Sequence, residues 1–482
     1  MYNEVLFKCD LAQAPVPLPH FWEHAVGSDH AVMGLRADWQ SQLERAHREL
    51  GFRYTRFHGV LSDRMFTRTH EQDKPLYSFF NADSVFDFLR SIGMRPFVEL
   101  SFMPRILASG NETVFSYQAN VTPPRDYSEW AELVKTLVSH WVKRYGLNEV
   151  RRWYFEVWNE PNLHAFWTGT QADYFKLYRY TVEAIKSVDD ALQVGGPATA
   201  GNAWIKEFLD FCDSNNLPAD FVSTHHYPTD AFGQPGDDTE TQLAQSRRSI
   251  MREQARATRS EARGKPVYYT EWNSSSNARD PMHDDPYAAA FAVKTIMEAR
   301  GLVDGYGFWT FSDIFEENYM PSMPFHGGFG LLNLQGIAKP SYRAYQLLHG
   351  LGTELLNVSG THPTVDVWAT RGEGQITLLM SNYALPRHPI ATERVHTHLD
   401  HAAKMRSASL TRIDGDHASA KKVWQTMGCP EYLSRELVQV LDASSQLKWE
   451  VMTVEAFSGA VDLVVQLPPQ AVAAVQIELS TE

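Results

Sequence analysis

Between about residues 20 and 350, short apolar or aromatic runs alternate with amphipathic helical patterns, and this alternation constrains the possible fold most. Strands are expected near residues 20–28 and at 53–58, 95–100, 152–158, 193–196, 221–225, 267–270 and 305–310. Helices are expected at 37–50, 83–91, 127–145, 171–188, 203–215, 239–263 and 287–300. When strands and helices alternate along a chain, the strands usually lie parallel in one sheet and the helices cross over between them. Eight such units fit a closed (β/α)8 TIM barrel of the α/β class better than an open sheet.

After about residue 350 the pattern changes to short β-like segments separated by polar turns, with little helical periodicity. Such segments lie at 365–369, 375–381 and 472–479, and they predict a β-sandwich. The N-terminal run 5–11 is expected to pair into this sandwich. We therefore expect a catalytic barrel at residues 15–350, and a β-sandwich accessory domain at 351–482 that includes residues 1–14.

The 482 residues include 44 basic and 58 acidic side chains, which gives a formal net charge of −14. Such a surface repels a phosphate backbone, and no basic patch offsets it, so we expect no nucleic-acid partner. Three widely spaced cysteines favour neither a disulfide framework nor a structural zinc site. No apolar run is long enough to cross a membrane, and the N-terminus lacks the pattern of a signal peptide. We expect a cytoplasmic protein with no membrane partner.

Two glutamates follow strand-like runs, at the barrel end where catalytic residues are found. Glu160 lies between Asn159 and Pro161 after one such run, and Glu271 follows the run 267–270, three strands later. Glycosidic hydrolysis needs two such carboxyl groups, one that donates a proton and one that attacks the sugar or activates water. The two must also differ in pKa, as burial of one of them would ensure. Glu99 is interpreted as a carboxylate of the barrel interior that pairs with an arginine such as Arg56.

Longer strings around these glutamates resemble glycoside hydrolase family 39 of clan A, the β-xylosidases. The strings WYFEVWNEPN at 153–162 and YYTEWN at 268–273 look like the acid/base and nucleophile segments of the clan. Residues 33–63, WNEPNLHAFWTGTQADYFKLY at 158–178, GGPATAG at 195–201 and STHHYP at 223–228 are similar to the family itself. The resemblance covers nearly all of residues 30–350.

This resemblance implies a retaining double displacement with Glu160 as acid/base and Glu271 as nucleophile, about 5–5.5 Å apart. It also implies that Asn159 binds the 2-hydroxyl of the sugar and that Tyr227 orients the nucleophile. It implies no cofactor and no metal. The remaining substrate-binding residues that it implies are His58, Phe166, His225, Trp309, Glu316 and Glu317.

Each assignment has a structural alternative. Asn159 could be a turn residue, His58 and Trp309 could be barrel core, and Glu316 with Glu317 could be a solvated acidic loop. His225 and His226 could suggest a metal, but adjacent strand residues point to opposite faces, so we expect His226 to point away.

The expected activity is that of an exo-acting β-xylosidase that releases xylose from xylo-oligosaccharides. Residues 280–285 and 311–334 would wall the pocket. Alternatives are an α-L-arabinosidase, a β-glucosidase, a uronidase-like enzyme or a non-catalytic carbohydrate-binding protein. A uronate would favour a basic residue in the pocket, and none can be placed there from the sequence. The sequence does not indicate an oligomeric state.

Overall fold

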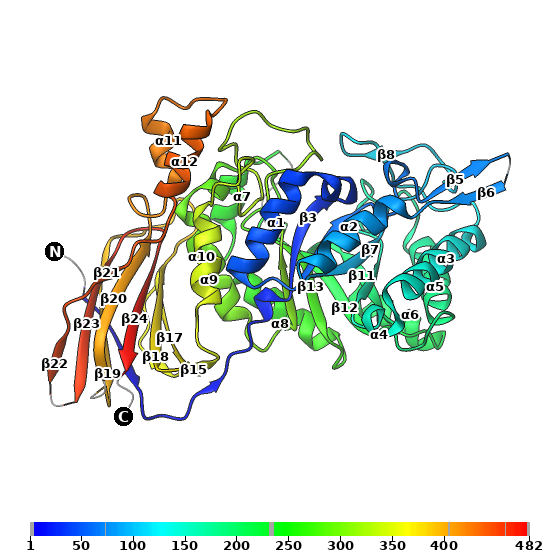
Figure 1. Cartoon of the computed structure of the whole chain (residues 1–482). Helices are drawn as coiled ribbons and strands as arrows, with labels where there is room; N and C mark the ends of the chain where they lie inside the picture. Colours follow the sequence, from blue (N-terminus) through cyan, green and yellow to red (C-terminus); the bar gives the residue numbers. More distant parts are fainter. Residues whose placement is uncertain (1–3, 73, 231–235, 403–404, 458, 480–482) are drawn as a thin grey trace.

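The computed structural model describes residues 4–72, 74–230, 236–402, 405–457 and 459–479. Eight parallel strands close into a barrel in the order β10-β11-β12-β13-β14-β3-β4-β7, which confirms the predicted TIM barrel (Figure 1). The strands are β3 (Ala25–His30), β4 (Tyr54–His58), β7 (Arg95–Leu100), β10 (Tyr154–Val157), β11 (Gln193–Thr199), β12 (Phe221–His226), β13 (Val267–Trp272) and β14 (Gly305–Phe308). All eight lie at or beside a strand expected from the sequence.

Helices surround the barrel and bury one face against it. They are α1 (Ala37–Leu50), α2 (Phe80–Ser91), α3 (Tyr127–Tyr145), α4 (Leu147–Val150), α5 (Gln171–Lys186), α6 (Ile205–Ser214), α7 (Thr239–Gln245), α8 (Ile250–Glu261), α9 (Pro286–Ala299) and α10 (Pro340–His349). In α3 the apolar side chains that recur every three or four positions are fully buried, from Trp130 to Trp141. In the described part of the chain, no helix has the length and apolarity needed to span a bilayer.

Side chains that point into the barrel form layers, because every second residue of a strand faces inward. At the N-terminal ends of the strands, aromatic rings pack edge to face into a lower aromatic layer of His24, Tyr54, Phe97, Tyr154, Phe221 and Tyr268. The next layer is charged and contains Arg56, Glu99 and Glu156, all fully buried. Above it, at the C-terminal ends, lie the candidate site residues.

One helix prediction is wrong, because the segment expected at 239–263 is broken into α7 and α8. Arg248 lies in the break and contacts the C-terminal sheets. There its guanidinium donates hydrogen bonds to the carbonyls of Thr364 (2.7 Å) and Tyr383 (2.9 Å) and pairs with Asp366. These tertiary contacts interrupt a helix that the local sequence pattern would continue.

The C-terminal region forms two sheets packed face to face, which confirms the predicted β-sandwich. The five-stranded sheet has the order β16-β1-β19-β23-β22, with β1 (Glu4–Asp10), β16 (Val358–Ser359), β19 (Glu393–Asp400), β22 (Glu455–Phe457) and β23 (Ala460–Leu467). The seven-stranded sheet has the order β2-β15-β17-β18-β24-β20-β21, with β2 (Val16–Pro17), β15 (Glu354–Leu356), β17 (Val365–Gly372), β18 (Gln375–Asn382), β20 (Met405–Ile413), β21 (Glu450–Val451) and β24 (Ala471–Leu479). The N-terminal strand pairs with β19, as expected.

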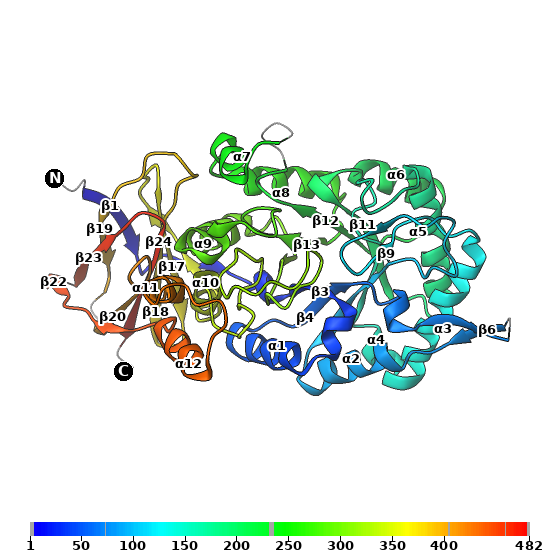
Figure 2. The same ribbon diagram turned by 90° about the horizontal axis from the view of Figure 1, so that it is seen from above.

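The seven-stranded sheet also packs on the barrel through α9 and α10 (Figure 2). Helix α9 is almost entirely buried, because one side faces the barrel and another faces β18 and β24. Two short hairpins extend the barrel loops: β5 (Arg68–Glu71) with β6 (Lys74–Tyr77), and β8 (Thr113–Val114) with β9 (Ala119–Asn120).

Contrary to the all-β expectation after residue 350, two helices lie between β20 and β21. They are α11 (Ala420–Thr426) and α12 (Arg435–Ser444), and we call residues 414–449 the helical insertion. It lies beside the long loop between β14 and α10, where Trp424 packs against Phe325 at 5.5 Å between ring centroids. Lys421 also pairs with Asp285 at 2.8 Å. Both helices are short, so their periodicity was too brief to stand out in the sequence.

Candidate active site

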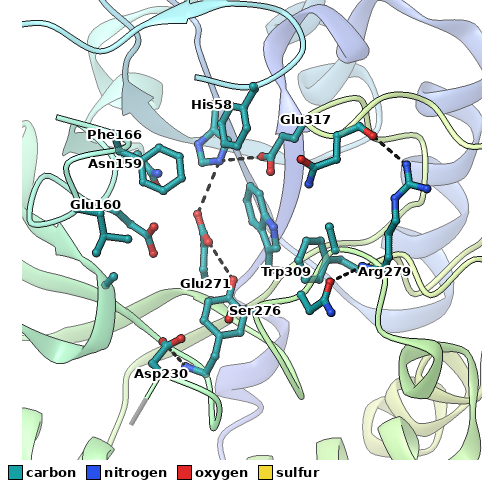
Figure 3. A pocket seen from close by; sticks show the side chains of 18 residues that line it. His58, Asn159, Glu160, Phe166, Asp230, Glu271, Ser276, Arg279, Trp309 and Glu317 are labelled. Atoms are coloured by element: carbon teal, nitrogen blue, oxygen red, sulfur yellow. Dashed lines mark hydrogen bonds and ion pairs between the residues drawn. The ribbon is translucent and has the colours of Figure 1, made fainter. Parts of the chain in front are cut away.

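A cavity of about 640 Å³ opens at the C-terminal end of the barrel (Figure 3). Its walls come from the loops that follow several barrel strands, as in other barrels of this type. Eight of the ten predicted site residues line it: His58, Asn159, Glu160, Phe166, Tyr227, Glu271, Trp309 and Glu317. The other lining residues are Phe115, Leu163, Ala200, Asp230, Ser276, Asn277, Ala278, Arg279, Asn318 and Phe329.

Glu271 reaches the cavity because β13 is irregular near its end. The register with both neighbouring strands shifts there, and such a bulge re-aims side chains. Thr270 and Glu271 both face inward as a result, while Trp272 turns outward and stacks on Tyr306 at 4.3 Å. The consequence is that a carboxylate stands at the barrel mouth directly above the charged layer.

Hydrogen bonds hold both oxygens of Glu271. Arg56 donates to Oε1 at 2.6 Å and the Tyr227 hydroxyl donates to Oε2 at 3.0 Å. Burial and the neighbouring carboxylate of Glu271 raise the pKa of Tyr227 well above its usual value, so the hydroxyl stays a donor. Two donors that favour the charged form suit a nucleophile that must remain ionised.

Arg56 is the central cation of the barrel interior. Its guanidinium also pairs with Glu156 at 2.6 Å and with Glu99 at 2.8 Å, and donates to Oδ1 of Asn159 at 2.9 Å. The interpretation of Glu99 as a partner of Arg56 is therefore confirmed. Burial alone would lower the pKa of Arg56, but its three carboxylate neighbours raise it, so the charge is permanent.

Glu160 lies on the loop after β10 in a left-handed backbone conformation with φ of 45°. A non-glycine residue in this conformation costs about 1–3 kcal/mol and persists where surrounding contacts hold it. Here the Glu160 backbone N–H donates to the carbonyl of Ala198 at 2.8 Å. Burial raises the pKa of the Glu160 carboxyl group to about 7, which suits a group that must carry a proton near neutral pH.

The carboxyl groups of Glu160 and Glu271 face each other across the cavity (Figure 3). An oxygen of each, with one nitrogen of His225, lies within 4.8 Å of the others. Retaining glycosidases have carboxyl groups about 5–5.5 Å apart, whereas inverting enzymes leave about 6.5–9.5 Å for a water molecule. The short separation matches the retaining arrangement.

His58 joins the charged layer to the loop after β14. Its Nδ1 lies 2.7 Å from Glu99, and its Nε2 lies 3.4 Å from Glu317. Burial alone would lower the pKa of His58, but Glu99 and Glu317 outweigh it and hold the pKa well above its usual value. The imidazole is therefore a buried cation beside the cavity, and not a neutral core residue.

Asn159, Phe166 and Trp309 form parts of the cavity wall. The Oδ1 atom of Asn159 accepts from Arg56, so its NH₂ group is left to face the cavity. Trp309 tilts against His58 at 4.8 Å between ring centroids, and Phe166 packs against Phe115 at 5.4 Å. Flat apolar faces of this kind suit the apolar faces of a sugar ring.

Two predicted residues lie behind the cavity and do not line it. His225 contacts Glu160 with its Nδ1 at 2.9 Å. Glu316 turns to the other side of its loop, where it pairs with His30 and Arg64, and its pKa is lowered to about 2 by the His30 hydrogen bond. His226 points away from His225, as expected, and its Nε2 lies 2.7 Å from the Tyr306 hydroxyl.

The sequence profile of the glycosyl hydrolases family 39 matches residues 5–462. The chain belongs to glycosyl hydrolase family 39. A relative called "Beta-xylosidase" from Caldicellulosiruptor saccharolyticus is 51% identical over 435 residues, which cover 89% of each chain. Another "Beta-xylosidase", from Geobacillus stearothermophilus, is 37% identical over 476 residues, covering 95% of this chain and 92% of the relative. The crystal structure of a monomeric β-xylosidase from Caulobacter crescentus CB15 superposes with a TM-score of 0.87 at 32% identity, over 99% of this chain and 100% of that one.

This family 39 chain also has residues around its site that were not predicted from its sequence. Arg56, Glu156 and Thr270 lie at inward strand positions, so their period-two spacing could have indicated them. Arg279 could not be found in this way, because it lies on the loop after β13, where no periodicity applies. Its guanidinium lies at the cavity mouth and donates to the carbonyl of Asn318 at 2.9 Å, so a basic residue does border the cavity (Figure 3).

Proposed function

We propose that this family 39 protein is a retaining, exo-acting β-xylosidase that releases terminal xylose from xylo-oligosaccharides. The observation that carries the proposal is the pair of buried carboxyl groups of Glu160 and Glu271, whose oxygens lie within 4.8 Å of each other. They face a cavity that is lined by aromatic and polar side chains, which suit a sugar. The names of the two relatives called "Beta-xylosidase" that are described above support the choice of sugar.

In the first step, the Glu271 carboxylate attacks the anomeric carbon while Glu160 donates its proton to the leaving oxygen. The glycosidic bond breaks, a covalent glycosyl-enzyme ester forms, and the shortened oligosaccharide leaves. In the second step, Glu160 takes a proton from water, which attacks the anomeric carbon and releases Glu271. Two inversions retain the anomeric configuration.

The surrounding residues fit supporting roles in this reaction. Asn159 would donate from its NH₂ group to the 2-hydroxyl, and Tyr227 would hold Glu271 in position through its hydroxyl at 3.0 Å. Trp309 and Phe166 would stack against the sugar, and His58 with Glu317 would bind its hydroxyls. Glu316 would act through the position of its loop, since it does not line the cavity.

The proposed partner is a small xylo-oligosaccharide, without a cofactor, a metal, nucleic acid or a membrane. The proposed location is the cytoplasm, which fractionation of the producing cells would test.

A uronidase-like activity is the second candidate, because Arg279 places a cationic side chain at the cavity mouth. A panel of p-nitrophenyl glycosides separates the candidates. We expect the β-D-xyloside to be the fastest substrate. A dominant rate on the uronide, the α-L-arabinoside or the β-D-glucoside would replace the β-xylosidase proposal, and binding without hydrolysis would indicate a carbohydrate-binding protein.

The roles of the two glutamates are tested by azide rescue. Glu271→Ala should reduce turnover at least about a thousandfold, because the attacking group is lost. Azide should then yield the α-xylosyl azide, the inverted product. Glu160→Ala should still form the intermediate from an activated dinitrophenyl xyloside, and azide should yield the β-xylosyl azide. Exchange of these two outcomes would mean that the roles are reversed, and wild-type rates in both variants would disprove the site.

A further inference from the structure

We propose that Thr270 is a positioning residue that holds His225 in the tautomer protonated on Nε2, so that Glu160 must rest in its protonated form. The inference rests on the proposed function, since it concerns the proton that Glu160 would donate. It assigns a role to a hydroxyl that lies below the cavity and does not line it.

The contacts that orient Thr270 begin at the charged layer. Glu156 is fully buried, and Arg56 donates to its Oε2 at 2.6 Å, so this carboxylate is part of an ion pair and can only accept hydrogen bonds. The Thr270 hydroxyl lies 2.8 Å from Oε1 of Glu156 and donates to it. The hydroxyl proton of Thr270 therefore points toward Glu156, away from the cavity.

The Thr270 hydroxyl oxygen also lies 3.1 Å from Nε2 of His225. Because its proton is already used, this oxygen can only accept from His225, so Nε2 carries a hydrogen. Burial lowers the pKa of His225 to about 4, which makes the ring neutral at working pH. A neutral imidazole carries one proton, and Nδ1 is therefore left with a lone pair.

That lone pair faces Oε1 of Glu160 at 2.9 Å, while Oε2 of Glu271 lies farther from the same nitrogen, at 3.6 Å. Two acceptors 2.9 Å apart would repel, so Glu160 must donate and is protonated. The arrangement penalises the ionised form of Glu160 in addition to burial, which is the largest of the effects that together raise its pKa to about 7. The same penalty makes an ionised Glu160 a stronger base when the second step requires it to take a proton from water.

The other charged or titratable groups around Glu160 come from β4, β7, the segment after β12, and β13. They are Arg56, His58, Glu99, Tyr227, Asp230 and Glu271. A substitution at Thr270 leaves all six in place. Thr270 also donates to Glu156, the partner of Arg56, so the titration of Glu160 in such a variant is read together with the proton positions on His225.

The first test compares Thr270→Val with Thr270→Ser through the pH profile of kcat/KM on xylobiose, which reports the free enzyme. Valine removes the acceptor for Nε2–H, so the ring adopts the other tautomer and donates from Nδ1 to an ionised Glu160. We expect the alkaline limb to move down by at least about one pH unit, because a hydrogen bond to the charged form favours it. Serine should keep the wild-type limb. An unchanged limb in the valine variant would overturn the proposal.

The second test needs no variant and therefore does not depend on the folding of one. Neutron diffraction of the deuterium-exchanged wild-type protein locates the protons directly. Below pH 7 we expect deuterium on Nε2 of His225, on the Glu160 carboxyl group and on Thr270 pointing at Glu156. Deuterium on Nδ1 of His225 would refute the relay. If the wild-type protein instead cleaves no xyloside, the proposed function fails, while the neutron map still decides the relay.

Discussion

At the scale of single residues, the two glutamates differ because their surroundings differ. Both are buried, but Glu271 accepts from Arg56 and Tyr227, which favour a carboxylate, whereas the hydrogen-bond partner of Glu160 is a neutral imidazole. Chemically identical side chains thus acquire opposite tasks, as the double displacement requires, and burial raises the pKa of the Glu160 carboxyl group to about 7.

The raised pKa of Glu160 predicts a pH-dependent cost in stability. The pKa is about 7 in the folded protein against an ordinary value of 4.5, so the folded state binds the proton more tightly. The stabilisation from this proton is complete below about pH 4.5 and is lost as pH rises through 7. Glu160→Gln keeps a donor toward His225 but does not titrate. Relative to this variant, the wild type should lose about 3 kcal/mol of unfolding free energy between pH 4.5 and pH 8.

Urea denaturation of both proteins at the two pH values measures this difference. Glu44→Gln, on the exposed face of α1, is the matched control for the loss of one carboxyl group. A wild-type to Glu160→Gln difference that stays constant from pH 4.5 to pH 8 would contradict the raised pKa.

Much of the site could be predicted at this scale, and what could not has physical reasons. Glu160 and Glu271 were predictable because barrel chemistry lies where strands end. The inward direction of the Glu271 side chain beside Thr270 was not predictable, because the alternation of apolar and polar residues in a strand does not reveal a bulge. The position of Arg279 was not predictable either, because tertiary contacts, such as its hydrogen bond to the carbonyl of Asn318, place a loop residue.

At the scale of elements, the helical insertion supports the active-site loop from outside the barrel. Phe325, Ile337, Trp424 and Leu441 form a small core between the insertion and the loop after β14, which also carries Glu317 and Phe329 into the cavity. The insertion belongs to the region that follows the barrel in sequence. A second part of the chain therefore helps to shape the substrate pocket.

Trp424→Ala should loosen this loop and weaken substrate binding. We expect KM to rise between about three- and tenfold, equivalent to about 0.7–1.4 kcal/mol, with a smaller change in kcat. Hydrogen exchange should also increase in residues 311–334. Tyr432→Ala is the control, because Tyr432 lies in the same insertion and is 78% exposed. If KM and hydrogen exchange are unchanged in the Trp424 variant, the loop keeps its conformation without support from the helical insertion.

Element prediction from the sequence succeeded where packing and local pattern agree, as in α3. It failed at α7 and α8, where contacts of Arg248 with Thr364 and Tyr383 override a continuous amphipathic pattern. It also failed for α11 and α12, whose seven and ten residues are too short for their period to be distinguished from that of strands.

At the scale of the whole molecule, we propose two units, a catalytic barrel at 15–350 and a β-sandwich at 351–482 with residues 1–14. The pairing of β2 with β15 would suit a first boundary after Pro17. The interface is apolar, because α9 packs against β18 and β24, and side chains such as Leu379 and Val472 join the core of the barrel. We infer that the units depend on each other for stability.

Deletion of residues 351–482 should therefore expose the outer face of α9 and leave an aggregating barrel without a near-ultraviolet dichroism signal. Replacement of residues 414–449 by a short linker is the matched control, because it removes the helical insertion and spares the interface. That variant should fold and show only the raised KM. A soluble, cooperatively unfolding barrel after the large deletion would contradict this dependence.

The lower aromatic layer closes the barrel beneath the two glutamates. The carboxyl groups are therefore reached from the C-terminal side of the barrel, where Arg279 is among the residues that line the cavity. The departing oligosaccharide occupies that side, so the second reactant enters only after the first product has left. Water and any abundant alcohol then compete for access from this side of the barrel. The ratio of hydrolysis to transfer of xylose to an alcohol then depends on the residues at the cavity opening. Substitutions there can change this ratio without altering Glu160 or Glu271.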